Sequence, residues 1–286
     1  MPVSSPVPHS RRIRWYAKKT SRTGMAAIAG GLGRWRPGNN AATGIRVLTY
    51  HRFGPSLRDP FCVEVGDFDA QMAWVAKNGL ALTLEEIEAY LAGDPDTRRE
   101  GVLVTIDDGF KSLLTAAVPV LARHRIPAVA FIPVGKVGGD EDGSEPHLTW
   151  AELAIVAQAG VTIGSHSWSH RSFARLPRER MQEEAVRSRE VLEDRLGSRI
   201  SAFAYPFGTR ADYSREAAAV LEASGYACAF TSQHEALRPG MHRFMLPRIK
   251  IEGGEGLATF RRVCRGGLDA WSWVDRRLSF LQERGQ

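Results

Sequence analysis

The segment Val102-Leu103-Val104-Thr105-Ile106-Asp107-Asp108-Gly109-Phe110 begins with apolar, β-favouring residues and ends in two carboxylates and a glycine. This pattern is typical of a buried parallel strand that carries acidic side chains to the C-terminal edge of an α/β fold. Adjacent strand residues point to opposite sides, so Asp107 and Asp108 should differ in role unless a turn re-aims them. The alternative is that an aspartate only caps the helix expected to follow.

A second segment adds metal-binding side chains, and it reads Ile163-Gly164-Ser165-His166-Ser167-Trp168-Ser169-His170. Two histidines four residues apart lie on one side of a helical turn or tight loop, as in other zinc sites with this spacing. A histidine pair alone also suits an exposed surface loop. Together with an acidic strand end, the pair gives three protein ligands with one position open, which is the pattern of a catalytic metal site.

Strand-like and helix-like segments alternate along the chain. Besides the aspartate segment, strands are expected at 45–50, 128–132, 161–163, 201–205, 226–231 and 243–251. Helices are expected at 67–78, 112–124, 178–196, 212–224, 257–265 and 271–282, and after capping boxes at Thr83/Glu86 and Thr149/Glu152. This α/β alternation implies right-handed crossovers and a parallel sheet. Since no G-x-G-x-x-G follows the first strand, we predict a distorted (β/α)7-type barrel with its site at one mouth.

Three motifs resemble those of a known family. Thr105 to Gly109 is similar to the first motif of the polysaccharide deacetylases, the NodB-homology domain of carbohydrate esterase family 4. His166 to His170 matches the second motif, and Ala204-Tyr205-Pro206-Phe207-Gly208 resembles the third, within a similarity that extends over roughly 45–250. The resemblance implies a distorted barrel and a hydrolase that removes N-acetyl groups from N-acetylhexosamine units of a polysaccharide, oligosaccharide or lipid-linked glycan.

The resemblance also implies roles for individual residues. Asp108, His166 and His170 would hold the metal, either Zn²⁺ or another divalent ion such as Co²⁺ or Ni²⁺. Asp107 would be the general base. Residues expected to contact substrate are Tyr205, Pro206, Phe207, Trp168 and Arg248. Because Pro206 has no N–H, the backbone donor to the developing oxyanion would be the amide of Phe207.

The chain departs from the family pattern at two places. Ala204 replaces the arginine that orients the catalytic aspartate in the family, and no L-x-x-H motif supplies a general acid. Both absences resemble the poly-N-acetylglucosamine deacetylase branch, in which a Tyr-His after the first strand supplies the acid. Thr49-Tyr50-His51-Arg52-Phe53 is similar to that segment, so His51 is the expected acid, with His242 in reserve. Arg248 is expected to orient Asp107 or to contact substrate.

Two other functions are compatible with these motifs. The same site could hydrolyse a non-sugar amide or an O-acetyl ester. Alternatively, the protein could be a non-catalytic carbohydrate- or surface-binding module, although such a module needs no metal triad.

The net charge of +6 is concentrated at one end of the 286-residue chain. Residues 1–44 hold eight Lys or Arg and no Asp or Glu, so we expect a basic, disordered tail before a catalytic domain at 45–252 and a helical extension at 253–286 packed on the barrel. The tail could contact an anionic membrane surface peripherally, contact nucleic acid weakly and non-specifically, or serve only for solubility. No specific nucleic-acid partner is expected, and the oligomeric state is left open.

Targeting signals are weak in this sequence. No segment is long and apolar enough for a transmembrane helix, and none has a clear signal-peptide pattern. We therefore expect a cytoplasmic protein or one peripheral to the inner face of the membrane, with the cell envelope as the alternative. The three cysteines are widely spaced and form no C-x-x-C, which argues against a disulfide scaffold or thiolate zinc site.

Overall fold

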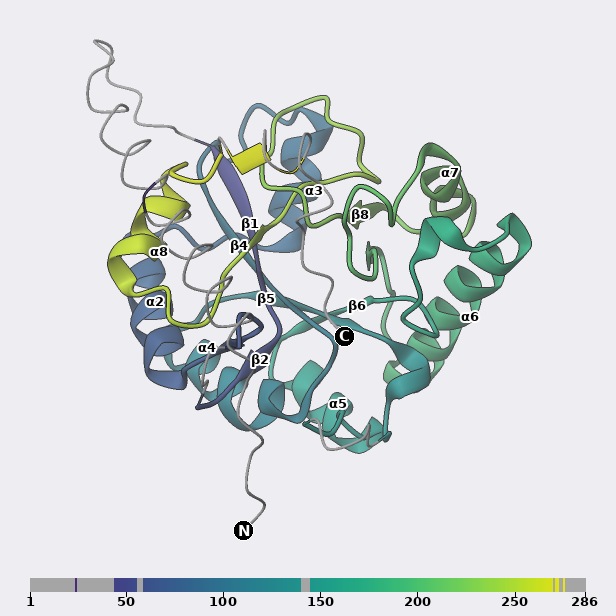
Figure 1. Cartoon of the computed structure of the whole chain (residues 1–286), viewed down its shortest axis with the longest axis horizontal. Helices are drawn as coiled ribbons and strands as arrows, with labels where there is room; N and C mark the ends of the chain where they lie inside the picture. The colour runs from purple at the N-terminus through teal and green to yellow at the C-terminus, as the bar shows by residue number, and fades with distance from the viewer. Residues whose placement is uncertain are drawn as a thin grey trace, which may run out of the picture.

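A seven-stranded parallel sheet forms the centre of the protein (Figure 1). The computed structural model describes residues 24, 44–55, 59–139, 145–269, 271, 272 and 275. The sheet has the order β8-β7-β6-β5-β4-β1-β9. Its strands are β1 (Ile45–Tyr50), β4 (Gly101–Asp107), β5 (Ala128–Ile132), β6 (Thr162–Ser165), β7 (Ala202–Ala204), β8 (Cys228–Phe230) and β9 (Ile249–Lys250). The sheet curls into a half-barrel flanked by helices, which confirms the predicted (β/α)7-type fold.

The two edges of the curled sheet are linked by the segment 246–251. Its first part pairs with the strand-β8 edge, where Phe230 and Leu246 form a parallel bridge and the Thr231 N–H donates to the Leu246 carbonyl at 2.7 Å. Its last part pairs with β1, and the Ile251 N–H donates to the Thr49 carbonyl at 3.0 Å. Because the segment passes from one edge to the other, β9 is only two residues long and not the 243–251 strand expected.

Helices cover the outside of the sheet (Figure 1). They are α2 (Val65–Lys77), α3 (Leu84–Ala92), α4 (Val118–His124), α5 (Trp150–Gln158), α6 (Arg178–Leu196), α7 (Arg215–Ala223) and α8 (Leu257–Cys264). Both predicted capping boxes, at Thr83 and Thr149, are present. The helix expected at 112–124 is instead a π-helix, Leu113–Ala117, followed by α4. Pro119 has no N–H for the preceding turn, so a regular α-helix cannot continue through this point.

A short parallel pair, β2 (Arg52–Phe53) with β3 (Cys62–Val63), was not expected from the sequence and places His51 between β1 and β2. The three cysteines are free thiols, and Cys62 is only partly buried. The basic tail at 1–44 and the helix at 271–282 lie almost wholly outside the described residues. Within the part of the chain that the structure describes, every helix is too short or too polar to span a bilayer.

Buried polar side chains gather where the central strands end. Asp107, His166 and Arg248 are each at most 3% exposed, although the surrounding strands are packed almost entirely with apolar residues. Burying charged groups costs free energy unless they are paired or bind an ion. This edge of the sheet is therefore the candidate functional site.

Candidate metal centre and active site

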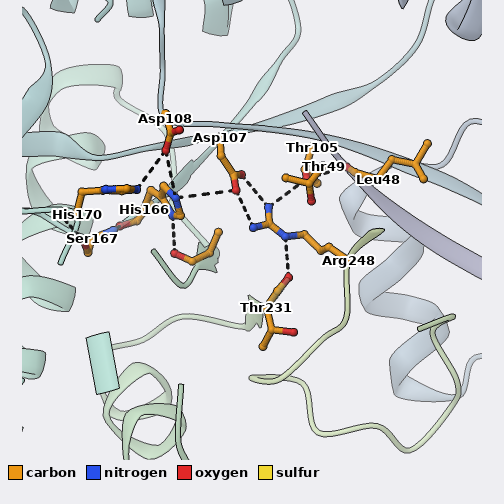
Figure 2. Close-up of polar contacts among 12 residues, drawn as sticks. Leu48, Thr49, Thr105, Asp107, Asp108, His166, Ser167, His170, Thr231 and Arg248 are labelled. Atoms are coloured by element: carbon orange, nitrogen blue, oxygen red, sulfur yellow. Dashed lines mark hydrogen bonds and ion pairs between the residues drawn. The ribbon is translucent and has the colours of Figure 1, made fainter. Parts of the chain in front are cut away.

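Asp108, His166 and His170 converge at the C-terminal edge of the sheet (Figure 2). Asp108 directly follows β4, and both histidines follow β6. The His170 Nε2 lies 3.2 Å from the Asp108 Oδ1, and the His166 Nε2 lies 3.5 Å from the same oxygen. One donor atom from each residue lies within 4.8 Å of the others. The three side chains that were predicted to share a cation are therefore brought together.

Unusual backbone conformations produce this convergence. Among the described residues, five that are not glycine have positive φ, and four of them are at this site: Asp108 (73°), Ser167 (65°), His170 (57°) and Phe207 (62°). The left-handed region is unfavourable for such residues and persists where the surroundings impose it, often at functional sites. The turn at Asp108 also removes it from strand alternation, so it can face the histidines while Asp107 stays on β4.

The second hydrogen bond of His166 fixes the orientation of its ring. Its Nδ1 donates to the Ala204 carbonyl at 2.7 Å, which leaves the Nε2 lone pair facing the carboxylates. Burial lowers the pKa of His166 to about 4, against the opposing effect of Asp107. A neutral imidazole with a free Nε2 at physiological pH is the form that binds a metal.

Asp108 is ionised at the same pH. Burial acts to raise the pKa of its carboxyl, but the hydrogen bond and charge of His170 outweigh burial and hold this pKa well below its usual range. One carboxylate oxygen and two imidazole nitrogens form a donor set suited to a divalent transition metal such as Zn²⁺. By donor type and spacing, these three residues fit a metal ion.

Glu184 supports the histidine loop from behind and was not singled out from the sequence. Its Oε2 accepts the backbone N–H groups of Trp168 (2.9 Å) and Ser169 (2.8 Å), the two residues before His170. Glu184 is only 6% exposed and lies on the buried face of α6 beside Ala185. A carboxylate on the apolar face of an amphipathic helix was the signal that could have revealed it.

Asp107 is held by Arg248 (Figure 2). The guanidinium donates to both carboxylate oxygens at 2.7 Å, and it also donates to Thr105 Oγ1 (3.2 Å) and to the Thr231 carbonyl (3.0 Å). Burial acts to raise the pKa of Asp107, but the charge of Arg248 holds it below the ordinary value. Arg248 is 1% exposed, and its contact with Asp107 is consistent with the expectation that it orients this residue, while contact with substrate stays a prediction.

The segment from Tyr205 to Phe207 is only partly accessible. Tyr205 is fully buried and its hydroxyl donates to the Phe244 carbonyl at 3.0 Å, so the predicted contact of this side chain with substrate is corrected: it packs in the core. Pro206 is also buried. Phe207 is partly exposed, and its ring centroid lies 5.1 Å from that of His170. Within the described residues, no group accepts a hydrogen bond from the Phe207 amide.

The two histidines considered as general acid lie in different surroundings. The His51 ring packs edge-on against Phe61, with centroids 4.9 Å apart, and its buried Nδ1 has no hydrogen-bond partner among the described residues. Burial lowers the pKa of His51, against the opposing charges of Asp108 and Asp107. His242 is exposed, and its Nδ1 accepts the N–H of Phe244 at 3.3 Å within its own loop.

The chain is similar to known polysaccharide deacetylases. Residues 94–228 match the model of the polysaccharide deacetylase family. The candidate polysaccharide deacetylase YxkH of Bacillus subtilis is 29% identical over 217 residues, which are 75% of this chain and 74% of that protein. The poly-beta-1,6-N-acetyl-D-glucosamine N-deacetylase of Escherichia coli K12 is 27% identical over 260 residues, covering 76% of this chain but only 38% of that protein. Among solved structures, IcaB from Ammonifex degensii aligns with a TM-score of 0.68 at 27% identity, over 79% of this chain and 97% of that one.

Proposed function

Because residues 94–228 of this chain form a polysaccharide deacetylase domain, we propose that the protein is a metal-dependent hydrolase that removes N-acetyl groups from N-acetylhexosamine units of a glycan. The observation that carries the proposal is the convergence of Asp108, His166 and His170, whose donor atoms lie within 4.8 Å of one another. A divalent ion held there would polarise the acetamide carbonyl and lower the pKa of a water molecule.

Asp107 is the proposed general base. It lies on the strand that leads to Asp108, and its Oδ2 is 3.9 Å from the His166 Nε2, so it borders two of the three candidate ligands. The bidentate contact with Arg248 keeps the carboxyl ionised and fixes its plane. An ionised, immobile carboxylate beside the metal ligands is suited to accepting the proton of the attacking water.

Phe207 and His51 are proposed to handle the oxyanion and the leaving amine. The Phe207 amide belongs to a turn with positive φ, and none of the described residues accepts its hydrogen. This leaves the N–H available to a developing oxyanion. Burial lowers the pKa of His51, but the charges of Asp108 and Asp107 oppose this effect and favour the protonated imidazole, which supports His51 as the group that protonates the leaving nitrogen.

The proposed catalytic domain is longer than the matched range and extends over 45–252. Two proposed site residues, His51 and Arg248, lie outside 94–228 but reach the site through β1 and the segment 246–251. Residues from 253 onward are proposed to pack on the barrel, since Phe260 of α8 contacts Trp74 of α2 with ring centroids 5.9 Å apart. The substrate named for the Escherichia coli relative makes a poly-N-acetylglucosamine the first glycan to test.

The test combines metal analysis with acetate release from N-acetylglucosamine oligomers. The purified protein should contain one divalent ion per chain and release acetate. Asp107→Asn should keep the ion and lose acetate release, whereas Asp108→Asn should lose both. Asp96→Asn, at an exposed position, is the matched control and should change neither. Full acetate release by Asp107→Asn would refute the assigned base, and absence of acetate from every acetylated glycan would refute the proposed function.

A further inference from the structure

A small pocket lies between the histidine loop and the first turns of α6. Its volume is about 230 Å³, and it is lined by Trp168, Ser169, Arg171, Arg180, Glu183, Glu184 and Arg187. We infer that this pocket binds a compact oxyanion, a carboxylate or phosphate carried by the glycan, so that the substrate is an acidic glycan. The inference rests on the proposed function and names a substrate class for it. The volume suits one charged substituent, because pockets for whole small molecules are usually larger, about 300–1,000 Å³.

The charges that line the pocket favour an anion. Its two carboxylates are already engaged: the Glu184 Oε2 accepts two backbone N–H groups, and Glu183 pairs with Arg180. Within the part of the chain that the structure describes, neither Arg171 nor Arg187 has a carboxylate at ion-pair distance. With three arginines and two glutamates, the lining carries one excess positive charge, and the guanidinium groups of Arg171 and Arg187 are not paired with either carboxylate.

One of these guanidinium groups is held in place by an aromatic ring. The Cζ of Arg187 lies 3.6 Å from the centroid of the Trp168 ring. Such a contact uses the face of the guanidinium and leaves N–H groups at its edge for an anion. Arg187 covers one face of the Trp168 ring, so this face supports an arginine, while direct contact of Trp168 with substrate stays a prediction.

The tryptophan is itself fixed by its neighbours. Gly135 donates its N–H to the Trp168 carbonyl at 2.9 Å. A Cβ at position 135 would come within 2.8 Å of that oxygen and 3.1 Å of the indole Nε1, so only glycine allows this close approach. A cation held on an immobilised ring loses less conformational entropy when it binds a ligand.

The pocket and the metal cluster belong to the same loop. Trp168 and Ser169 lie between the candidate ligands His166 and His170, and Arg171 directly follows the second ligand. The inference puts the anionic group of the glycan in this pocket, next in sequence to the candidate ligand His170, where it would add affinity for the substrate. Guanidinium groups form charge-assisted hydrogen bonds with carboxylates and phosphates, which gives the pocket selectivity over neutral glycans.

The first experiment measures binding to the full-length, metal-loaded protein. Inorganic phosphate and D-glucuronate are titrated calorimetrically into the wild type and into a variant that combines Arg171→Gln with Arg187→Gln. Arg175→Gln is the matched control, since Arg175 is an exposed arginine of the same loop that does not line the pocket. The double variant should bind at least one of the two anions at least tenfold more weakly than the control does. Equal binding of both anions by the double variant and the control would overturn the inference, because anions at the metal would bind both equally.

The second experiment measures substrate choice and distinguishes the two sources of negative charge. For a carboxylate, kcat/KM is compared between heparosan oligosaccharides and the same oligosaccharides with their uronate carboxyls reduced to alcohols. For a phosphate, N-acetylglucosamine 1-phosphate is compared with methyl N-acetylglucosaminide. At least one charged member should be preferred tenfold or more by the wild type, and the double variant should lose that preference. No preference for either charged member, or a preference that survives in the double variant, would overturn the inference.

The proposed function and the inference fail in different ways. Acetate release from neutral N-acetylglucosamine oligomers tests the deacetylase activity by itself. Acetate release from these oligomers without any preference for charged glycans would support the proposed function and refute the inference. If no glycan yields acetate, the function fails, and the anion titration alone decides whether the pocket is an oxyanion site.

Discussion

Replacing Arg248 by methionine removes the contact that fixes the proposed catalytic base. The guanidinium donates to both oxygens of Asp107 at 2.7 Å, and both residues are at most 3% exposed, so water cannot replace the lost partner. Removing one member of a buried ion pair typically costs about 3–5 kcal/mol, because the other charge is left buried alone. We expect Arg248→Met to lower the free energy of unfolding by an amount in that range.

The same substitution should change the pH dependence of activity. The positive charge of Arg248 lowers the pKa of Asp107, so its removal raises this pKa. The base is active only when ionised, and the acidic limb of the kcat/KM profile should therefore move to higher pH. The measurements are urea unfolding and acetate release across pH.

Arg46→Met is the matched control for this experiment. Arg46 is also 1% exposed and pairs with Asp269 at 2.7 Å, but it lies near the start of β1, at the other end of the strand from the site. Arg46→Met should lower the free energy of unfolding by only roughly 1–3 kcal/mol, since the carboxylate of Asp269 is 31% exposed and can be hydrated. The pH profile of this variant should be unchanged. If the acidic limb of the kcat/KM profile stays at its wild-type pH in Arg248→Met, or moves equally far in Arg46→Met, Arg248 does not set the pKa of the catalytic base.

Three further perturbations test the protonation of His166, the close packing at Gly135 and the role of His51. The metal-free protein should lose about 3 kcal/mol of stability between pH 6.5 and 4, because the unfolded chain protonates His166 near 6.5 and the folded chain only near 4. Urea unfolding at several pH values between 6.5 and 4 measures this loss, and His166→Gln should show a smaller dependence of the free energy of unfolding on pH. An equal pH dependence in the wild type and the variant would count against the lowered pKa of His166. Gly135→Ala should lower the free energy of unfolding by about 1–3 kcal/mol, because the new Cβ clashes with the Trp168 carbonyl oxygen of the histidine loop. Gly66→Ala, with open space around its Cβ, should be neutral or stabilising by up to about 1 kcal/mol, and thermal melts compare the two. His51→Gln should lower kcat by about 10²–10⁴-fold with the metal content unchanged, and a rate within threefold of wild type would remove His51 as the acid.

Much of the fold follows from local sequence patterns. The strands at 45–50 and 128–132 have the predicted bounds, because short apolar runs bounded by polar or turn-forming residues define a buried parallel strand. The capping boxes at Thr83 and Thr149 set the starts of α3 and α5 for a similarly local reason. In contrast, β2 and β3 are two residues each and depend on tertiary pairing, which leaves no periodic signal.

The candidate site was predicted in part. The identities of Asp108, His166 and His170 came from their residue types and spacing, and the structure places them together. The fully buried position of Tyr205 depends on long-range packing, since its hydroxyl reaches Phe244, and local sequence cannot reveal this. The two hydrogen bonds from Arg248 to Asp107 join residues 141 positions apart in the sequence. They depend on a segment that crosses from β8 to β1, which local sequence patterns do not reveal.

The central claim is that Asp108, His166 and His170 share one cation. Anomalous diffraction from crystals of the metal-loaded protein, collected above and below the absorption edge of the metal found by elemental analysis, tests this directly. We expect one anomalous peak within about 2.0–2.2 Å of a carboxylate oxygen of Asp108 and of one nitrogen on each histidine. A metal-loaded crystal with its anomalous peak elsewhere, or with no peak between these three side chains, would contradict it.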